Sequence, residues 1–274
     1  MTVLVVLLGL VISHYLIGLK RFRDYRWLPA LMHRASKRWA GHDWLPCALI
    51  LLIALVAGFG LNALIVLWLG WPGWFVFNLL VFVYCLGPRD LDRDVHALRS
   101  AGQADHDPEL AARAARALQL GPLPDGREAG AAVVHAAFSR WFGILFWFVI
   151  LGPAGALTYR LTRVALRDPD LDQGQLAWLA HLRLVIDWPV LVLSVISAGL
   201  CGDLDRVNQA RRAYATDRPG FWLWPSLLDR VAEAIVDPQA DMSCGLLQAH
   251  QMVWRMLVLW LVFMSLMLLA GWLS

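Results

Sequence analysis

Ionisable side chains inside apolar segments are the residues of this chain that could do chemistry. His14 lies in the apolar run 3–19, and Asp187 lies in the apolar segment 184–202. An ionisable group inside a membrane is costly unless it faces a partner or a water-filled cavity, so both are candidate functional residues. The alternative is that both lie near a membrane surface, where Asp187 would cap a helix starting at Trp188.

A second candidate group closes a long apolar run. Tyr159, Arg160 and Arg163 fall within about one helical turn, so a helix would present them together. Two interpretations stay open. The three side chains either anchor the end of a span at the membrane interface or form a cluster that binds an anion.

Signatures of nucleotide, cofactor and metal sites are absent from the sequence. It contains no GxxxxGK[ST], HExxH, GxSxG or GxGxxG pattern, and its cysteines are scattered without metal-ligand spacing. The stretch Asp105-His106-Asp107 resembles a ligand set, but its position before a helix favours capping. We therefore expect no cofactor and no bound metal.

The composition indicates the environment that must hold these residues. Of the 274 residues, 59% are apolar and 16% charged, and the mean hydropathy is +0.56. Soluble domains have about 25% charged residues. The sequence therefore predicts an integral membrane protein, and the small net charge of +3 gives no reason to expect a nucleic-acid partner.

The apolar runs predict an all-α polytopic membrane protein with four to six transmembrane helices. Residues 44–88 contain no Asp, Glu, Lys, Arg or His, and the stretch is more than twice the length needed to cross about 30 Å of hydrocarbon. The turn signal Gly70-Trp71-Pro72-Gly73 divides this stretch into two spans. Within a single membrane domain covering 1–274, the expected spans are 3–19, 45–69, 74–87, 141–161, 188–202 and 256–273, the first and fifth being weaker.

The segments between the spans are expected to be helical. Asp107-Pro108 begins a helix through Leu120, Asp125 with Glu128 forms a capping box, and Asp172 with Gln175 opens a helix over 173–186. Three further helices are expected near 203–215, 225–236 and 242–254.

The basic residues set the expected orientation. If all six segments span, then 20–43, the insertion 88–140 and the loop 203–252 share one side, and 70–73 and 162–183 share the other. The first set carries most of the Arg and Lys, so that side is expected to be the cytoplasm.

Four stretches resemble a known family. The run from Phe142 to Leu161, with Gly152-Pro153-Ala154-Gly155-Ala156 and Tyr159-Arg160, resembles a signature of AmpE-type membrane proteins and, more distantly, of the CobD/CbiB proteins of cobalamin biosynthesis. Three stretches resemble the AmpE side in the same order: Cys85-Leu86-Gly87-Pro88-Arg89-Asp90-Leu91, Val185-Ile186-Asp187-Trp188-Pro189-Val190 and Arg255-Met256-Leu257-Val258-Leu259-Trp260-Leu261. Arg89 lies in the first of these three stretches and is therefore a further candidate site residue. AmpE relatives often have a carboxylate near position 14, where this chain has His14.

The resemblance to AmpE implies a multi-pass protein of the bacterial inner membrane that modulates β-lactamase induction. Such proteins are linked to peptidoglycan recycling, so the implied partners besides membrane lipids are a muropeptide or the recycling amidase, and catalysis is not expected. The alternative is an amide-forming membrane ligase similar to CobD/CbiB. Here the Asn-Thr-Leu-Asp that follows Tyr-Arg in those enzymes is replaced by Leu161-Thr162-Arg163-Val164-Ala165. A third hypothesis, a small-solute transporter, would explain His14 and Asp187 but lacks a detectable internal repeat.

The predicted orientation can be tested by cysteine labelling. Gly73→Cys should react with a membrane-impermeant thiol reagent added to intact cells, and Ala104→Cys should not, because the loop containing Ala104 belongs to the basic side. The parent chain supplies the background from its native cysteines. The reverse labelling pattern would invert the orientation.

Overall fold

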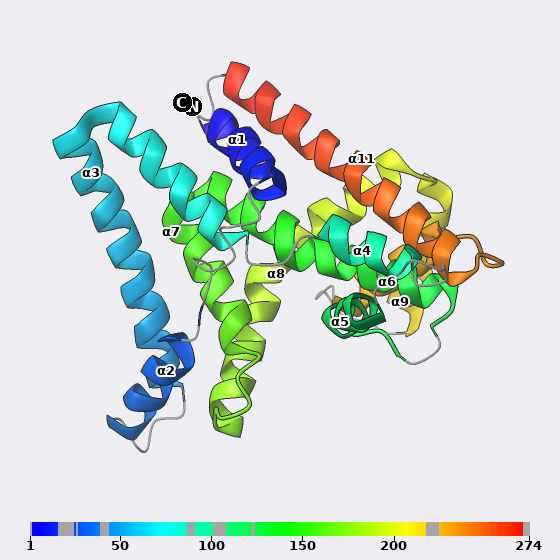
Figure 1. Cartoon of the computed structure of the whole chain (residues 1–274), viewed down its shortest axis with the longest axis horizontal. Coiled ribbons are helices and arrows are strands. Elements are labelled where there is room, and N and C mark those ends of the chain that lie inside the picture. Colours follow the sequence, from blue (N-terminus) through cyan, green and yellow to red (C-terminus); the bar gives the residue numbers. More distant parts are fainter. Residues whose placement is uncertain are drawn as a thin grey trace. The chain divides into compact units, whose positions relative to one another are not determined.

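In the residues that the structure describes, all regular secondary structure is helical. The structure is a computed structural model and describes residues 2–15, 25, 27–38, 44–86, 91–100, 108–121, 124–217 and 225–270. Four helical stretches are long and apolar enough to cross a membrane: Leu45–Cys85, Gly126–Ala165, Gln173–Cys201 and Met242–Met267. The prediction of an all-α polytopic membrane protein is therefore confirmed (Figure 1).

The chain divides into two compact units, which are described separately. The first unit comprises Met1–Pro88, Gly143–Asp187 and Leu268–Ser274, and the second comprises Arg89–Phe142 and Trp188–Met267. The helices of the first unit are α1 (Thr2–Tyr15), α2 (Trp27–Arg38), α3 (Leu45–Cys85), α7 (Gly143–Ala165) and the beginning of α8 (Gln173–Cys201).

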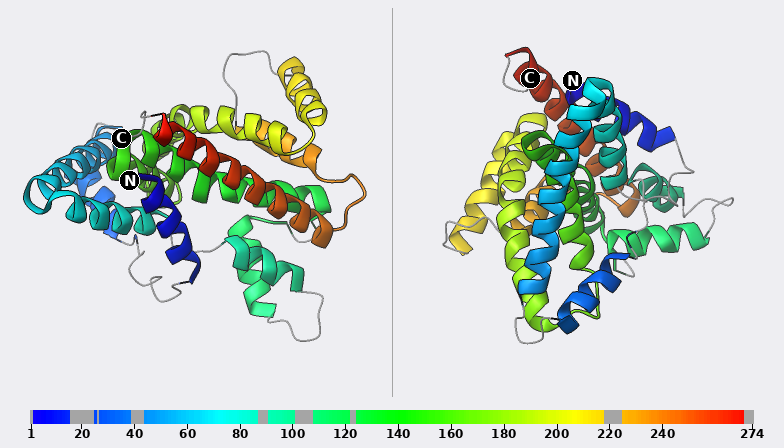
Figure 2. Two further views of the ribbon diagram at one scale, coloured as in Figure 1. Left: turned by 90° about the horizontal axis from the view of Figure 1, so that it is seen from above. Right: turned by 90° about the vertical axis from the view of Figure 1, so that its left-hand side faces the viewer.

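Helix α3 reverses direction at a single glycine. Gly70 has φ 65° and ψ −157°, a backbone region open essentially to glycine alone. The side-chain amide of Asn78 donates to the Asn62 Oδ1 at 3.0 Å and thereby joins the two arms. The reversal, visible in Figure 1 and in the left view of Figure 2, lies where the sequence predicted the turn.

Helix α7 contains a second reversal, which the sequence analysis did not predict. Gly152 has φ 62° and ψ −152° and precedes Pro153. A Cβ atom added to Gly143 would lie 2.2 Å from the hydroxyl oxygen of Tyr159, although a straight helix would separate these residues by about 24 Å. The expected uninterrupted span over 141–161 is therefore corrected, because the chain folds back on itself at Gly152.

Small residues bring α3 close to its neighbours. A Cβ atom added to Gly58 would lie 2.8 Å from the Cβ of Ala154 on α7, and one added to Gly9 of α1 would lie within 2.4 Å of the Phe82 ring. The rings of Phe82 and Phe148 pack with centroids 4.8 Å apart. Close approach at small residues is the usual way in which helices associate in a bilayer.

The loop between α7 and α8 packs at the α2 end of the first unit. Leu171 and Leu179 share a buried cluster with Leu28 and Met32 of α2. The Gln175 side chain donates to the Ser36 hydroxyl at 2.5 Å, whereas the reversal of α3 lies at the far end of its first arm (Figure 1). The expectation that 162–183 lies opposite 20–43 is therefore corrected. Its physical reason is the reversal at Gly152, which returns the chain toward the end at which α2 lies.

Helix α8 joins two segments that the sequence analysis treated separately. The expected helix over 173–186 and the expected span 188–202 form one helix through Pro189. Pro189 cannot donate to the carbonyl four residues earlier, but such losses are tolerated in apolar helices that are packed against neighbours. Asp187 therefore lies inside a helix, and the alternative in which it caps a helix at Trp188 is wrong.

The second unit contains the predicted helical insertions. Its helices are the rest of α8, α4 (Leu91–Arg99), α5 (Pro108–Leu118), α6 (Gly126–Ala137), the π-helix η3 (Phe138–Phe142), α9 (Leu204–Asp217), α10 (Pro225–Ile235) and α11 (Met242–Leu269). The Asp125 cap is confirmed, since its side chain accepts from the Glu128 backbone N–H at 2.7 Å. The expected helix over 242–254 and the expected span from 256 are the single helix α11.

The amide pair across the Gly70 reversal can be tested by substitution. Asn78→Leu should lower the free energy of unfolding by about 1–2 kcal/mol, because the two arms lose their interhelical hydrogen bond. Reversible unfolding in mixed micelles measures the change. Asn62→Leu is the matched variant, and the double variant should lose less than the sum of the two. Additive losses would mean that the two amides are not coupled.

Candidate functional site

Asp187 forms the centre of a buried polar cluster in the first unit. Its side chain is only 4% exposed and accepts three hydrogen bonds. Tyr159 donates its hydroxyl to Oδ1 at 3.0 Å. Oδ2 accepts from Arg163 Nη1 at 3.0 Å and from Arg183 Nε at 3.1 Å. We call Tyr159, Arg163, Arg183 and Asp187 the Asp187 cluster.

Helical spacing and the Gly152 reversal together build the Asp187 cluster. Tyr159 and Arg163 lie four residues apart on the second arm of α7, and Arg183 lies four residues before Asp187 on α8, so each pair shares one helix face. The first arm of α7 contributes Trp147, whose indole N–H donates to the Ile186 carbonyl at 3.1 Å. This bond fixes the helix turn that carries Asp187.

Gly143 provides the space that the Tyr159 side chain occupies. A Cβ atom at Gly143 would lie 2.2 Å from both the Tyr159 hydroxyl oxygen and the ring carbon that bears it. The tyrosine thus lies directly against the backbone of the first arm, because no side chain intervenes. Any larger residue at 143 must displace the hydroxyl that donates to Asp187.

Two guanidinium groups surround one carboxylate in the cluster. A buried charge is stable only when it is paired and hydrogen-bonded, and Asp187 meets that condition on both oxygens. The cluster nevertheless has one positive charge more than it has negative charges. Arg183 is its most accessible member, with 29% of the side chain exposed, so the excess charge can be reached from outside.

Arg160 belongs to a neighbouring cluster and does not contact Asp187. Its guanidinium carbon lies 5.3 Å from the centre of the Tyr25 ring, within the range of a cation–π interaction. Tyr25 donates its hydroxyl to the Tyr84 carbonyl at 2.8 Å, and burial raises the pKa of Tyr25, so the phenol stays neutral beside the cation. The Nε atom of Arg160 is buried and has no hydrogen-bond partner in the described part of the chain.

The predicted site residues thus separate into three groups. Asp187, Tyr159 and Arg163 come together, and Arg160 lies on the adjacent face of α7 against Tyr25. His14 lies in α1, but its side chain is outside the described residues, as are Arg89 and the stretch Asp105-His106-Asp107. Sequence reasoning missed Arg183 and Gly143, although the four-residue spacing from Arg183 to Asp187 could have indicated the first.

A second buried ion pair lies in the second unit and was also missed. Arg140 donates from Nη1 to Asp94 Oδ2 at 2.8 Å and from Nη2 to the Ala117 carbonyl at 3.1 Å. Arg140 lies in η3, and such π-helical turns often mark functional positions. Here the pair connects η3 to α4 and to the end of α5, so it serves as a structural tie.

The Asp187 cluster is a buried network of ion pairs. Within the described ranges, no three His, Cys, Asp or Glu side chains gather as a metal site would require. Asp187 accepts three hydrogen bonds, so both of its oxygens are engaged. The cluster holds three charged side chains in fixed positions, and one of them, Arg183, is partly accessible.

Comparison of the chain with protein-family models, with curated proteins and with solved structures finds no match.

The fit between Gly143 and Tyr159 can be tested with a matched pair of glycines. Gly143→Ala should lower the free energy of unfolding by about 1–3 kcal/mol, because the new methyl group forces the tyrosine off Asp187. Gly60→Ala is the control, since nothing lies within 4 Å of the atom added there. Thermal unfolding in detergent compares the two. Equal effects would show that the Tyr159 contact is not tight.

Proposed function

We propose that this chain is a non-catalytic regulatory or sensory protein of the bacterial inner membrane, of the AmpE type, linked to peptidoglycan recycling and β-lactamase induction. The observation that carries the proposal is the meeting of two separate signature stretches. Tyr159 comes from the run 142–161 and Asp187 from the run 185–190, and their side chains form a 3.0 Å hydrogen bond. The residues behind the resemblance therefore build one physical cluster.

A third signature stretch begins beside the same region. It starts at Cys85, immediately after Tyr84, whose carbonyl accepts the hydroxyl of Tyr25. Tyr25 in turn lies under the guanidinium of Arg160. The first three stretches of the resemblance thus contribute to adjoining parts of the first unit, which supports a shared role for them.

The burial and ion pairing of Asp187 support a sensory role over a ligase or a transporter. A catalytic carboxylate must be accessible to its substrate, and a transport carboxylate must exchange partners during the cycle. Asp187 is bonded to three donors and nearly fully buried. Such a group is suited to hold two helices in one arrangement, which a ligand can then shift.

The excess arginine supports an anionic signal. Arg183 is bonded to Asp187 through Nε, which leaves the rest of its guanidinium to bind a second carboxylate. A muropeptide carries such carboxylates. In this proposal the ligand competes with Asp187 for Arg183, and the loosened contact between α7 and α8 is the signal to the partner.

A deletion strain with complementation tests the proposed function. Deletion should change inducible β-lactamase activity and the muropeptide level. Asp187→Ala and Arg160→Ala should reach the membrane at normal abundance but fail to restore either readout, because the two clusters lose their central groups. Glu233→Ala is the control, since it removes only an exposed ion pair with Arg230.

Two outcomes would contradict this proposal. Full complementation by both Asp187→Ala and Arg160→Ala would remove the clusters from the function. A deletion strain with unchanged β-lactamase induction and muropeptides but with lost corrinoid synthesis would instead favour the ligase.

A further inference from the structure

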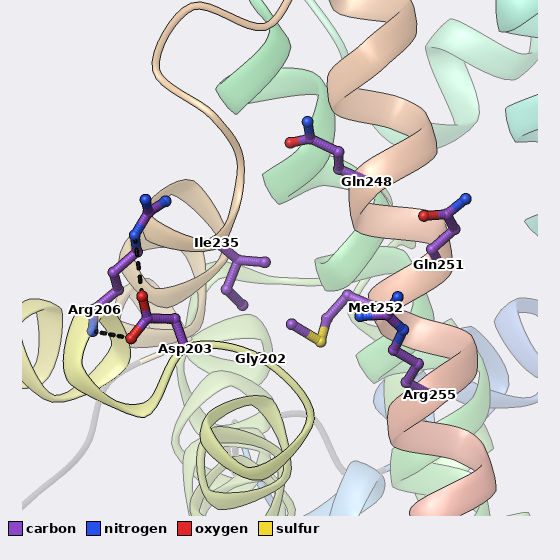
Figure 3. Close-up of a pocket in the computed structure, with 8 residues that line it drawn as sticks. All are labelled: Gly202, Asp203, Arg206, Ile235, Gln248, Gln251, Met252 and Arg255. Atoms are coloured by element: carbon purple, nitrogen blue, oxygen red, sulfur yellow. Dashed lines mark hydrogen bonds and ion pairs between the residues drawn. The ribbon is translucent and has the colours of Figure 1, made fainter.

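A cavity of about 230 Å³ lies in the second unit. It is formed where α8 ends and α9 begins, opposite the middle of α11, with Ile235 from α10 at its edge. Figure 3 shows Asp203 and Arg206 joined to each other on one side, and Gln251, Met252 and Arg255 of α11 on the other. The lining residues are Gly202, Asp203, Arg206, Ile235, Gln248, Gln251, Met252 and Arg255.

The cavity lies at the level where two neighbouring helices change from apolar to polar. Trp260 of α11 donates to the Ser197 hydroxyl of α8 at 2.8 Å, and a Cβ atom added to Gly202 would lie 2.3 Å from the Met252 methyl. These two contacts show that α8 and α11 run antiparallel.

The sequence on each side of the cavity defines the position of the membrane boundary. On α8 the uncharged stretch 188–202 ends at Asp203, and on α11 the uncharged stretch begins after Arg255. Both transitions therefore occur at the cavity. In a bilayer this is the level of the lipid headgroups.

The cavity has an excess of positive charge. Arg206 lies 3.3 Å from Asp203, but more than half of each side chain is exposed, so this pair is weak. The Asp203 carboxylate also caps α9 by accepting from the backbone N–H groups of Asp205 and Arg206. Arg255 forms no ion pair within the described ranges, and its guanidinium is available to an anion.

An apolar stripe leads from the cavity along α11. Gln248, Met252 and Arg255 line the cavity at helical spacing, and the same face continues with Val258, Val262 and Leu266. Each of these three side chains is at least half exposed. An acyl chain can lie along them while its headgroup reaches Arg255.

We propose that this cavity binds the phosphodiester headgroup of an anionic phospholipid. Arg255 and Arg206 bind the phosphate oxygens, because guanidinium groups match phosphate geometry and basic pockets between helices are typical headgroup sites. The Gln251 amide is left for the polar remainder of the headgroup, because the Gln248 amide already accepts from the Asp237 backbone N–H and donates to the Cys244 sulfur. The acyl chain follows the stripe from Val258. The site is independent of the proposed regulatory function.

Native mass spectrometry of the full chain in detergent tests the site. The protein should retain phosphatidylglycerol over phosphatidylcholine, and Arg255→Gln should weaken phosphatidylglycerol binding about fivefold, as expected for one cation at a lipid phosphate. Arg206→Gln should show a similar loss. Arg211→Gln is the matched control, because Arg211 lies on α9 outside the cavity and donates to Asn208.

Three outcomes would overturn the proposed lipid site. The first two are equal retention of phosphatidylglycerol and phosphatidylcholine, and a loss of phosphatidylglycerol binding in Arg211→Gln as large as in Arg255→Gln. Displacement of phosphatidylglycerol by millimolar inorganic phosphate would also overturn it, since that identifies a free-phosphate site. If Arg255→Gln does not fold, as judged by its helical circular dichroism, Arg206→Gln alone decides.

Discussion

The backbone conformation of Gly70 and Gly152 is the constraint on which the first unit depends. Both residues have φ near 60° and ψ near −155°, a combination that a side chain makes strained. In each case the chain reverses there without a loop, so helical hydrogen bonding resumes at once and few backbone groups are left unpaired in an apolar environment. The second reversal brings Gly143 against Tyr159 and so delivers the tyrosine to Asp187.

The two reversals share local chemistry that a search for sequence repeats does not detect. Gly70 is followed by Pro72 and Gly73, and Gly152 by Pro153 and Gly155. Proline is favourable at the start of the new arm because its missing N–H would be unsatisfied there in any case. The glycine that follows allows close contact between the arms, as where Gly155 approaches the Trp147 carbonyl. The resemblance is structural and spans only a few residues, so it leaves no periodicity.

The sequence predicted the fold class and the Gly70 turn because composition and turn residues are local signals. It did not predict the reversal in α7. A hydropathy profile carries no information on whether the chain turns back, and the run 141–161 has the length of a single span. It singled out Asp187, Tyr159 and Arg163 but left open that Asp187 caps a helix starting at Trp188, because a proline such as Pro189 often lies near a helix start. The Asp94–Arg140 pair was missed, since an ion pair between residues on different helices depends on packing that no single segment specifies. Arg183 was missed although it lies four residues before Asp187 on the same helix, a spacing that the sequence does show.

The sequence drew attention to a buried acid, Asp187, whereas the structure draws attention to the arginines around it. Buried carboxylates attract attention because they are costly in a membrane, yet Asp94 and Asp187 are both satisfied by arginine. Two cations keep unused hydrogen-bonding capacity: Arg160 has a buried Nε without a partner in the described part of the chain, and Arg183 shares one carboxylate with Arg163. Because a guanidinium keeps its charge at any physiological pH, these groups cannot relieve the excess by releasing a proton. An anion that binds them would supply the missing negative charge, as the proposed function requires, while the acids hold the helices in place.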